Sequence, residues 1–370
     1  MSMVTAHRRA RLESFLAAQV AVAVSAQTAN LEIDELRLYP VREPVSGRAW
    51  TVVRVGTRSG LAGYGECAHA SSDDLAAAQR FWLARPATSY ASAPADSPLA
   101  GAIDMALLDI VGKVAKAPVY RLLGGPTRSK ARAFASAEGV GAGVKRAIEA
   151  GYRAVGVRVP APAARNQGQA YQVELRKLVE TVRSQAADFV LEGEGLLTPG
   201  DAASVAAAIQ SLHPLWFDEP TTIGSLETLR KIADESVAPL GFGRDIRHAG
   251  VFQDLLRAGS LDVARPDILH FGITGSRRIA ALAETYYVAV APRHEGGPIA
   301  TAAALHLAAS LPNFFIQHIP LPAAAEDRAM RAQLAGGDLE RVKDGFASLP
   351  NGPGLGVTVN EAVLEKYHAA

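Results

Sequence analysis

The sequence has only one cysteine, no excess of charge of either sign and no long apolar run after its first thirty residues. The lone Cys67 excludes an intrachain disulfide and any cysteine-based metal cluster. Lys and Arg number 38 against 37 Asp and Glu, so no overall field attracts nucleic acid or an anionic membrane. No later stretch reaches the ~18 uninterrupted apolar residues of a membrane-spanning helix. We therefore expect neither a nucleic-acid nor a membrane partner.

The remaining composition is that of a globular protein. Hydrophobic residues make up 49% and charged residues 20% of the chain, close to the average for globular domains. Because barrel domains reach ~250 residues and other domains run to ~100–200, the 370 residues can form one large domain and a smaller one.

Residues 1–29 have a different pattern. Arg8 and Arg9 precede a mildly apolar run over 15–26 and then small residues, the order typical of a twin-arginine export signal. Glu13 and Gln19 interrupt the segment, so a frayed amphipathic helix stays open as the alternative. The first interpretation predicts export to the bacterial periplasm, and the second a cytoplasmic protein.

Residues 30–128 predict an α+β domain. Apolar and polar residues alternate from Leu31 to about Ala70, which indicates half-exposed antiparallel strands. Apolar residues then recur at helical spacing over 99–123, where Pro118 must bend or divide the helix. We expect the turn-rich segment 345–370 to complete this domain.

Residues 129–344 predict a (β/α)₈ barrel. Strand and helix patterns alternate at intervals of roughly 25 residues, which indicates parallel βαβ units. Eight strands, the number that closes a barrel, are predicted at 131–137, 153–159, 188–194, 215–218, 239–244, 261–267, 288–293 and 314–318. Six helices are predicted at 171–186, 199–212, 225–234, 250–258, 276–286 and 299–310.

Ionisable residues stand at the ends of seven of these strands. Active sites of such barrels lie where the strands end, at the C-terminal mouth, and so many charges there are hard to explain structurally. The residues are Arg158, Glu192, Glu194, Asp218, Glu219, Arg244, Asp245, Asp267, Arg293, His294 and His318.

Long motifs in the chain resemble a known family. Residues 102–113 (AIDMALLDIVGK) and 118–125 (PVYRLLGG) are similar to the signature of the mandelate racemase/muconate lactonizing group of the enolase superfamily. Supporting matches include GYGE at 63–66, FDEP at 217–220 and PGLG at 353–356. Residues 291–292, 297–299 and 316–317 most resemble the galactonate dehydratase-like sugar-acid dehydratases.

The resemblance implies a magnesium site. In the family, three carboxylates at the ends of strands three to five hold Mg²⁺, which stabilises the enediolate formed when a proton leaves the carbon next to a carboxylate. The matching positions are Glu192, Asp218 and Arg244. Because a guanidinium stays protonated, Mg²⁺ is doubtful, and we expect Arg244 to take its place and pair with the two acids. The alternative is Mg²⁺ held by these acids and Glu194 or Glu219.

The resemblance also implies which residues carry the chemistry. Arg158 stands on strand two where the family has a lysine base, and it is suited to clamp a carboxylate. Asp267 matches the family residue that orients a histidine, whose own position is Arg293, followed by His294. His318 and Glu194 are left as the groups that can move a proton.

Two functions follow from these positions. The first is a lyase or isomerase, possible without metal, that dehydrates or epimerises a sugar acid or hydroxy acid, with Arg158, Arg244 and Arg293 binding the substrate carboxylate. The second is a non-catalytic homologue that binds an anionic ligand. We expect Arg42, Arg48 and His69, from loops of the capping domain, to favour an acidic ligand, and we expect a homo-oligomer.

Overall fold

The computed structural model describes residues 30–92, 94, 97–160, 168–185, 188–209 and 212–369. The expected export segment, 1–29, lies outside these residues. Within them, none of the helices is long and apolar enough to cross a membrane.

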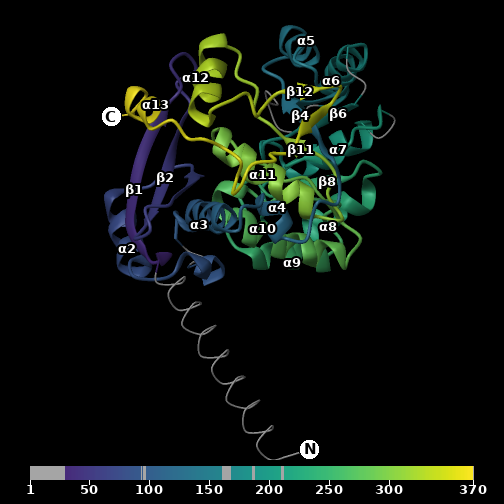
Figure 1. Ribbon diagram of the computed structural model, residues 1–370. Coiled ribbons are helices and arrows are strands. Elements are labelled where there is room, and N and C mark those ends of the chain that lie inside the picture. The colour runs from purple at the N-terminus through teal and green to yellow at the C-terminus, as the bar shows by residue number, and fades with distance from the viewer. Residues whose placement is uncertain are drawn as a thin grey trace, which may run out of the picture.

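The N-terminal domain is an antiparallel sheet covered by helices (Figure 1). Its strands β1 (Ile33–Arg42), β2 (Ala49–Thr57) and β3 (Ala62–Cys67) lie in sequential order. They are followed by α2 (Ser72–Trp82), the 3₁₀ helix η1 (Ala87–Ser92), α3 (Ala100–Val114) and α4 (Val119–Leu122). The α+β prediction is confirmed, and Pro118 separates α3 from α4 as expected.

The barrel has the eight predicted strands. They are β4 (Lys130–Ser136), β5 (Ala154–Arg158), β6 (Asp188–Glu192), β7 (Phe217–Asp218), β8 (Leu240–Phe242), β9 (Val263–Ala264), β10 (Ala289–Val290) and β11 (Gln317–His318). Neighbours from β4 to β10 pair in parallel, and β11 pairs with β4. Phe314, just before β11, bridges Val290 of β10, which completes the ring.

Helices cover the outside of the barrel (Figure 1). They are α5 (Ala142–Glu149), α6 (Gly168–Arg183), α7 (Pro199–Ile209), α8 (Leu226–Glu235), α9 (Ala249–Arg257), α10 (Ile268–Glu284) and α11 (Pro298–Ser310).

Helix α10 begins earlier than predicted. It starts at Ile268 rather than near Ser276, because the Asp267 side chain accepts the Leu269 N–H and caps the first turn. A kink at Gly272, with φ of 62°, interrupts it, and Asp104 of α3 accepts the freed N–H groups of Ile273 and Thr274. The kink therefore fits α10 against the capping domain.

The C-terminal segment returns to the capping domain. After α12 (Ala325–Ala335), strands β12 (Val342–Lys343) and β13 (Phe346–Ser348) form a hairpin whose second strand pairs antiparallel with β4. The last helix, α13 (Glu361–Lys366), lies beside β1 (Figure 1). His368 bridges Val41 of β1, so the chain end is attached to the sheet on which it began.

Two buried carboxylates of the capping domain bind segments that are distant in sequence, and one of them, Glu66, joins the domain to the barrel. Glu66 of β3 accepts the N–H groups of Gly297, Ile299 and Ala300 at the start of α11, where the helix dipole favours a negative charge. Asp109 of α3 accepts the N–H groups of Tyr64 and Leu355. The contact of Glu66 fixes the loop that carries Arg293 and His294 to the capping domain.

Candidate active site

The strand ends and one capping-domain loop enclose a cavity of about 610 Å³ at the C-terminal mouth of the barrel. Its charged and polar lining consists of five arginines, five acids, a serine and a histidine. These are Arg48, Arg158, Arg244, Arg265, Arg293, Glu138, Glu192, Glu194, Asp218, Glu295, Ser136 and His318. Because basic and acidic side chains are equal in number, their total charge does not determine what the cavity binds. The arrangement of the ion pairs determines it.

Two arginines share one glutamate on one side of the cavity. The Nε of Arg158 lies 2.6 Å from Glu194 Oε2, and Nη1 of Arg244 lies 3.1 Å from Glu194 Oε1. The Glu194 side chain is 19% exposed, against 66% for Arg158 and 39% for Arg244. The two guanidinium groups thus converge on one carboxylate position that solvent and ligands can reach.

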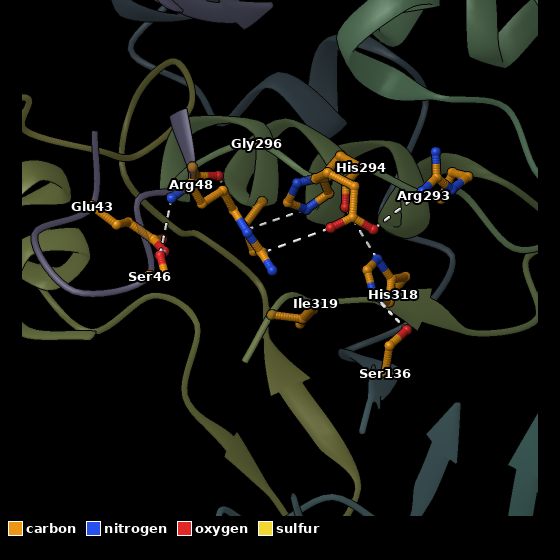
Figure 2. A network of polar contacts seen from close by, with 12 residues as sticks. Glu43, Ser46, Arg48, Ser136, Arg293, His294, Gly296, His318 and Ile319 are labelled. Atoms are coloured by element: carbon orange, nitrogen blue, oxygen red, sulfur yellow. Dashed lines mark hydrogen bonds and ion pairs between the residues drawn. The ribbon is translucent and has the colours of Figure 1, made fainter. Parts of the chain in front are cut away.

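A second pair of arginines, Arg48 and Arg293, shares Glu295. Arg293 is buried and contacts Asp267 at 3.4 Å and Glu295 at 3.1 Å. Arg48 extends from the capping loop to within 3.6 Å of Glu295, and Figure 2 shows it reaching toward the segment that carries Arg293. Burial raises the pKa of Asp267, while the charge of Arg293 opposes the rise. Residues of both domains therefore form the cavity wall.

His318 has a polar contact at each ring nitrogen (Figure 2), and one of the two nitrogens can accept a proton. Its Nδ1 lies 3.1 Å from the carbonyl oxygen of His294, and its Nε2 lies 3.3 Å from Ser136 Oγ. Because a carbonyl oxygen only accepts hydrogen bonds, Nδ1 carries the proton and Nε2 is the basic nitrogen. Burial, and then the charges of Arg265 and Arg293, lower the pKa of His318 well below its usual value.

Glu192 turns toward strand β4. Its Oε1 accepts a hydrogen bond of 2.5 Å from Ser136 Oγ, and this oxygen would lie only 2.3 Å from a Cβ at Gly156. Glycine on β5 thus leaves the space that the carboxylate fills. Removal from solvent, together with the charge of Asp218, raises the pKa of Glu192 to about 7 despite the hydrogen bond from Ser136.

Asp218 is paired with Arg265, an arginine that we did not select from the ends of the predicted strands. Its Oδ2 forms a buried ion pair with Nη1 of Arg265, and its Oδ1 accepts a 2.8 Å hydrogen bond from Trp216 Nε1. Our expectation that Arg244 pairs with Glu192 and Asp218 is wrong: Arg244 reaches outward to Glu194. The physical reason is that Arg265, which directly follows β9, is buried with Asp218 and occupies its carboxylate.

A magnesium ion does not fit these side chains. Glu219 is turned away, since its Oε1 accepts the N–H groups of Gly243 and Arg244 at 2.5 and 2.6 Å, and Asp218 is occupied by Arg265. At ~4 Å a guanidinium repels each unit of cation charge by about 4 kcal/mol at an effective dielectric of about 20. Over the described ranges, no three His, Cys, Asp or Glu side chains are grouped to hold a metal.

The remaining predicted residues do not line the cavity. His294 is fully buried and its Nε2 lies 3.3 Å from Thr301 Oγ1, so consecutive residues of the loop face opposite ways and only Arg293 reaches the mouth. Arg42 donates to the carbonyl oxygen of Gly47 within its own loop. His69 is exposed. Of the three expected capping-domain residues, only Arg48 lines the cavity.

Sequence reasoning missed four charged or polar lining residues, Arg265, Ser136, Glu138 and Glu295, and only the first two had a signal. Arg265 precedes Asp267 by two positions, and residues two apart in a strand face the same side. Ser136 is the last residue of β4, the strand whose end we did not consider. Glu295 lies in the loop after β10, where no periodicity predicts the direction of a side chain.

Comparisons with known proteins agree with this architecture. Residues 139–363 match the family model described as "Enolase C-terminal domain-like". The chain is 32% identical over 299 residues to a D-galactonate dehydratase of Ralstonia nicotianae, covering 74% of each chain. It is 30% identical over 306 residues to a D-gluconate dehydratase of Thermoproteus tenax, covering 79% of this chain but only 59% of that relative.

Solved structures have the same fold. An enolase from Agrobacterium radiobacter with bound sodium and L-malate is 27% identical, with a TM-score of 0.80 over 91% of this chain and 95% of the other. A mandelate racemase/muconate lactonizing enzyme from Sulfitobacter, 24% identical, has a TM-score of 0.80 over 92% of this chain and 96% of that chain.

The fold and site define a barrel enzyme with a capping domain. The chain belongs to the enolase superfamily, in its mandelate racemase/muconate lactonizing group. This confirms the resemblance drawn from the signature at residues 102–125. Because the relatives are enzymes, the comparisons favour the enzyme over the non-catalytic anion binder.

Proposed function

We propose that this protein is a hydro-lyase that removes water from a sugar acid or related hydroxy acid. The observation that carries the proposal is His318, whose basic Nε2 lies in a cavity lined by five arginines. Its relatives are named D-galactonate and D-gluconate dehydratases, and a fold neighbour was solved with L-malate, a hydroxy acid.

The substrate carboxylate binds at the shared position of Arg158 and Arg244. Both guanidinium groups already point to one carboxylate, that of Glu194, and planar guanidinium groups form paired hydrogen bonds with carboxylates. Displacing Glu194 lets a ligand carboxylate take the same contacts. The hydroxyl groups of the substrate then extend toward His318 and Arg293 in the same cavity.

His318 acts as the base. Its lowered pKa keeps the imidazole neutral at neutral pH, and the hydrogen bond from Nδ1 to the His294 carbonyl fixes the ring. When Nε2 takes the proton from the carbon next to the carboxylate, the electron pair of the C–H bond moves onto the carboxylate oxygens. The arginines surrounding the cavity stabilise this negative charge.

Loss of the β-hydroxyl completes the reaction. The electron pair returns from the oxygens to form the C=C bond, the β C–O bond breaks, and the imidazolium of His318 gives its proton to the leaving oxygen, which departs as water. The enol product then tautomerises to a 2-keto acid. The histidine is neutral again, so protons and electrons balance.

A sugar-acid library tests the proposal. The purified protein is incubated with aldonic, aldaric and smaller hydroxy acids in deuterated water, and NMR measures exchange of the α-proton while a carbonyl reagent measures 2-keto acid. We expect at least one acid to react, and His318→Ala to lose both signals. His306→Asn is the matched control, because His306 is buried in α11 and does not line the cavity.

Two results would change the assignment. Exchange that survives in His318→Ala but is lost in Glu194→Gln would make Glu194 the base. No exchange and no 2-keto acid with any member, while the acids still protect the protein against thermal unfolding, would restore the non-catalytic interpretation.

A further inference from the structure

We propose that the guanidinium of Arg265 performs the electrostatic task of a divalent cation in this cavity, so that the protein binds and activates its carboxylate ligand without metal. The claim that Arg265 activates the ligand rests on the proposed function. The claim that Arg265 excludes a metal ion does not depend on that function. Its basis is the position of Arg265 among the acids of the cavity floor.

Arg265 is more deeply buried than the other arginines of the cavity. It is 2% exposed and forms a buried ion pair with Asp218. Its Cζ lies 5.3 Å from the ring centroid of Trp216 and 5.6 Å from that of Phe134, within the range of cation–π attraction. Three contacts therefore hold one orientation of the guanidinium.

The surrounding charges require a cation at this point. Glu192 and Asp218 line the same cavity, and Glu219 is buried directly after Asp218. Burial and the charge of Asp218 raise the pKa of both glutamates, and the charge of Arg265 opposes part of this rise. Arg265 is thus a buried cation next to this group of acids, paired directly with Asp218.

Arg265 also has hydrogen-bonding capacity that its protein contacts do not use. A guanidinium has five N–H donors, and the ion pair with Asp218 is made through Nη1. Because Arg265 lines the cavity, a carboxylate oxygen of the ligand can bond to the donors that face it. The negative charge of that oxygen grows as the α-proton leaves, so the interaction strengthens in the transition state.

Binding of Mn²⁺, a spectroscopic probe for the site, separates Arg265 from Arg244. Electron paramagnetic resonance measures Mn²⁺ binding to the full chain, to Arg244→Glu, and to the double variant Arg244→Glu/Arg265→Gln. We expect stoichiometric binding only in the double variant, because the single variant restores a third carboxylate while Arg265 still occupies Asp218. Arg244→Glu/Arg265→Lys, which keeps the positive charge at position 265, is the matched control and should exclude Mn²⁺.

Three outcomes would overturn the metal-free assignment: stoichiometric Mn²⁺ in the unmodified chain, equal binding by Arg244→Glu alone, or no gain in the double variant. Thermal melts verify that each variant is folded. None of these readouts requires turnover, so a protein without dehydratase activity would refute the proposed function and leave this result intact.

Kinetics test the catalytic part with the substrate found in the library. Removing a donor that stabilises transition-state charge typically lowers kcat by ~100-fold or more, so we expect that loss in Arg265→Gln, unchanged by added Mg²⁺. Arg265→Lys should lie between this variant and the unmodified chain, because a lysine keeps the charge and loses the planar fork. A kcat within about threefold of the unmodified value in Arg265→Gln would reject the role.

Discussion

Buried titratable residues in this protein respond to pH in opposite directions. Burial, the largest cause in each case, raises the pKa of Glu66, Glu192 and Glu219 to about 7. Such a carboxyl binds more protons in the folded state, so its contribution to stability is lost as pH rises through 7. Burial lowers the pKa of His306 to about 4, and the contribution of its neutral form is lost as pH falls below 6.5.

His306→Asn isolates the histidine contribution. Nδ1 of His306 accepts the N–H of Tyr120 at 3.2 Å, and an asparagine oxygen can replace this acceptor without titrating. Between pH 6.5 and 4.5 the unmodified chain should lose about 2 kcal/mol more stability than the variant. Urea unfolding at both pH values measures the difference. An equal loss in both proteins would show that His306 does not titrate in this window.

Glu194→Gln tests whether a substrate carboxylate competes with Glu194. The variant removes the charge that Arg158 and Arg244 share, and exposed ion pairs of this kind contribute about 1 kcal/mol. We expect KM for the carboxylate to fall by up to ~10-fold, while kcat is retained. Glu138→Gln, another acid of the lining, serves as the control and should leave KM nearly unchanged. A higher KM in Glu194→Gln would instead mean that Glu194 contacts the substrate.

At the scale of elements, the capping sheet and α3 approach each other unusually closely. A Cβ added at Gly65 of β3 would lie 1.9 Å from the carbonyl oxygen of Ala102 in α3, and one at Gly63 would lie 2.0 Å from that of Ala106. Backbone cannot move aside as a flexible side chain can. The GYGE motif at 63–66 is thus explained by packing, which also brings Glu66 to the start of α11.

Gly65→Ala should separate β3 from α3. Overpacking of a core typically costs about 3 kcal/mol or less, and we expect the upper end of that range because the contact is with backbone. Gly200→Ala is the control, since Gly200 lies in α7 with nothing within 4 Å of an added Cβ. Urea unfolding should show a loss for the first variant and little change for the second. Equal stabilities would contradict the close packing.

The elements were predictable where one periodicity governs a segment. The alternation after Leu31 and the repeated strand–helix pattern after Lys130 were sufficient for both domains, because burial of one face determines them. The start of α10 was not predictable, because it depends on the Asp267 cap and on the contact of Asp104 with the kink at Gly272. Contacts between distant segments leave no periodic signal.

The sequence predicted where the site lies, but it did not predict which side chains of the site form ion pairs with each other. Strand ends identify which residues lie at the mouth, and Arg158, Glu192, Asp218 and His318 do line the cavity. A long arginine side chain reaches several acids from one backbone position, so sequence alone could not choose Glu194 over Glu192 for Arg244. The role of Arg265 required both its burial and its neighbours.

At the scale of the whole molecule, the capping domain closes part of the mouth through one loop. Residues 43–48 follow β1 and include Arg48 (Figure 2), whose guanidinium lies 3.6 Å from the carboxylate of Glu295. Glu43 forms a buried ion pair of 2.9 Å with Arg331 of α12. The loop is therefore fastened to the barrel side by a helix that follows the last barrel strand.

Asp327→Asn should loosen this loop. The Asp327 carboxylate in α12 accepts the N–H groups of Val45 and Ser46 at 2.9 and 3.0 Å, whereas an asparagine can accept only one of them and presents an NH₂ group to the other. Because Arg48 is carried by the same loop, KM for the carboxylate should rise by ~10-fold with little change in kcat, the pattern of lost ground-state binding. Limited proteolysis within 43–48 should become faster.

Glu326→Gln, at the exposed neighbouring position, is the control for Asp327→Asn. Faster cleavage with an unchanged KM would show that closure of the loop does not contribute to binding.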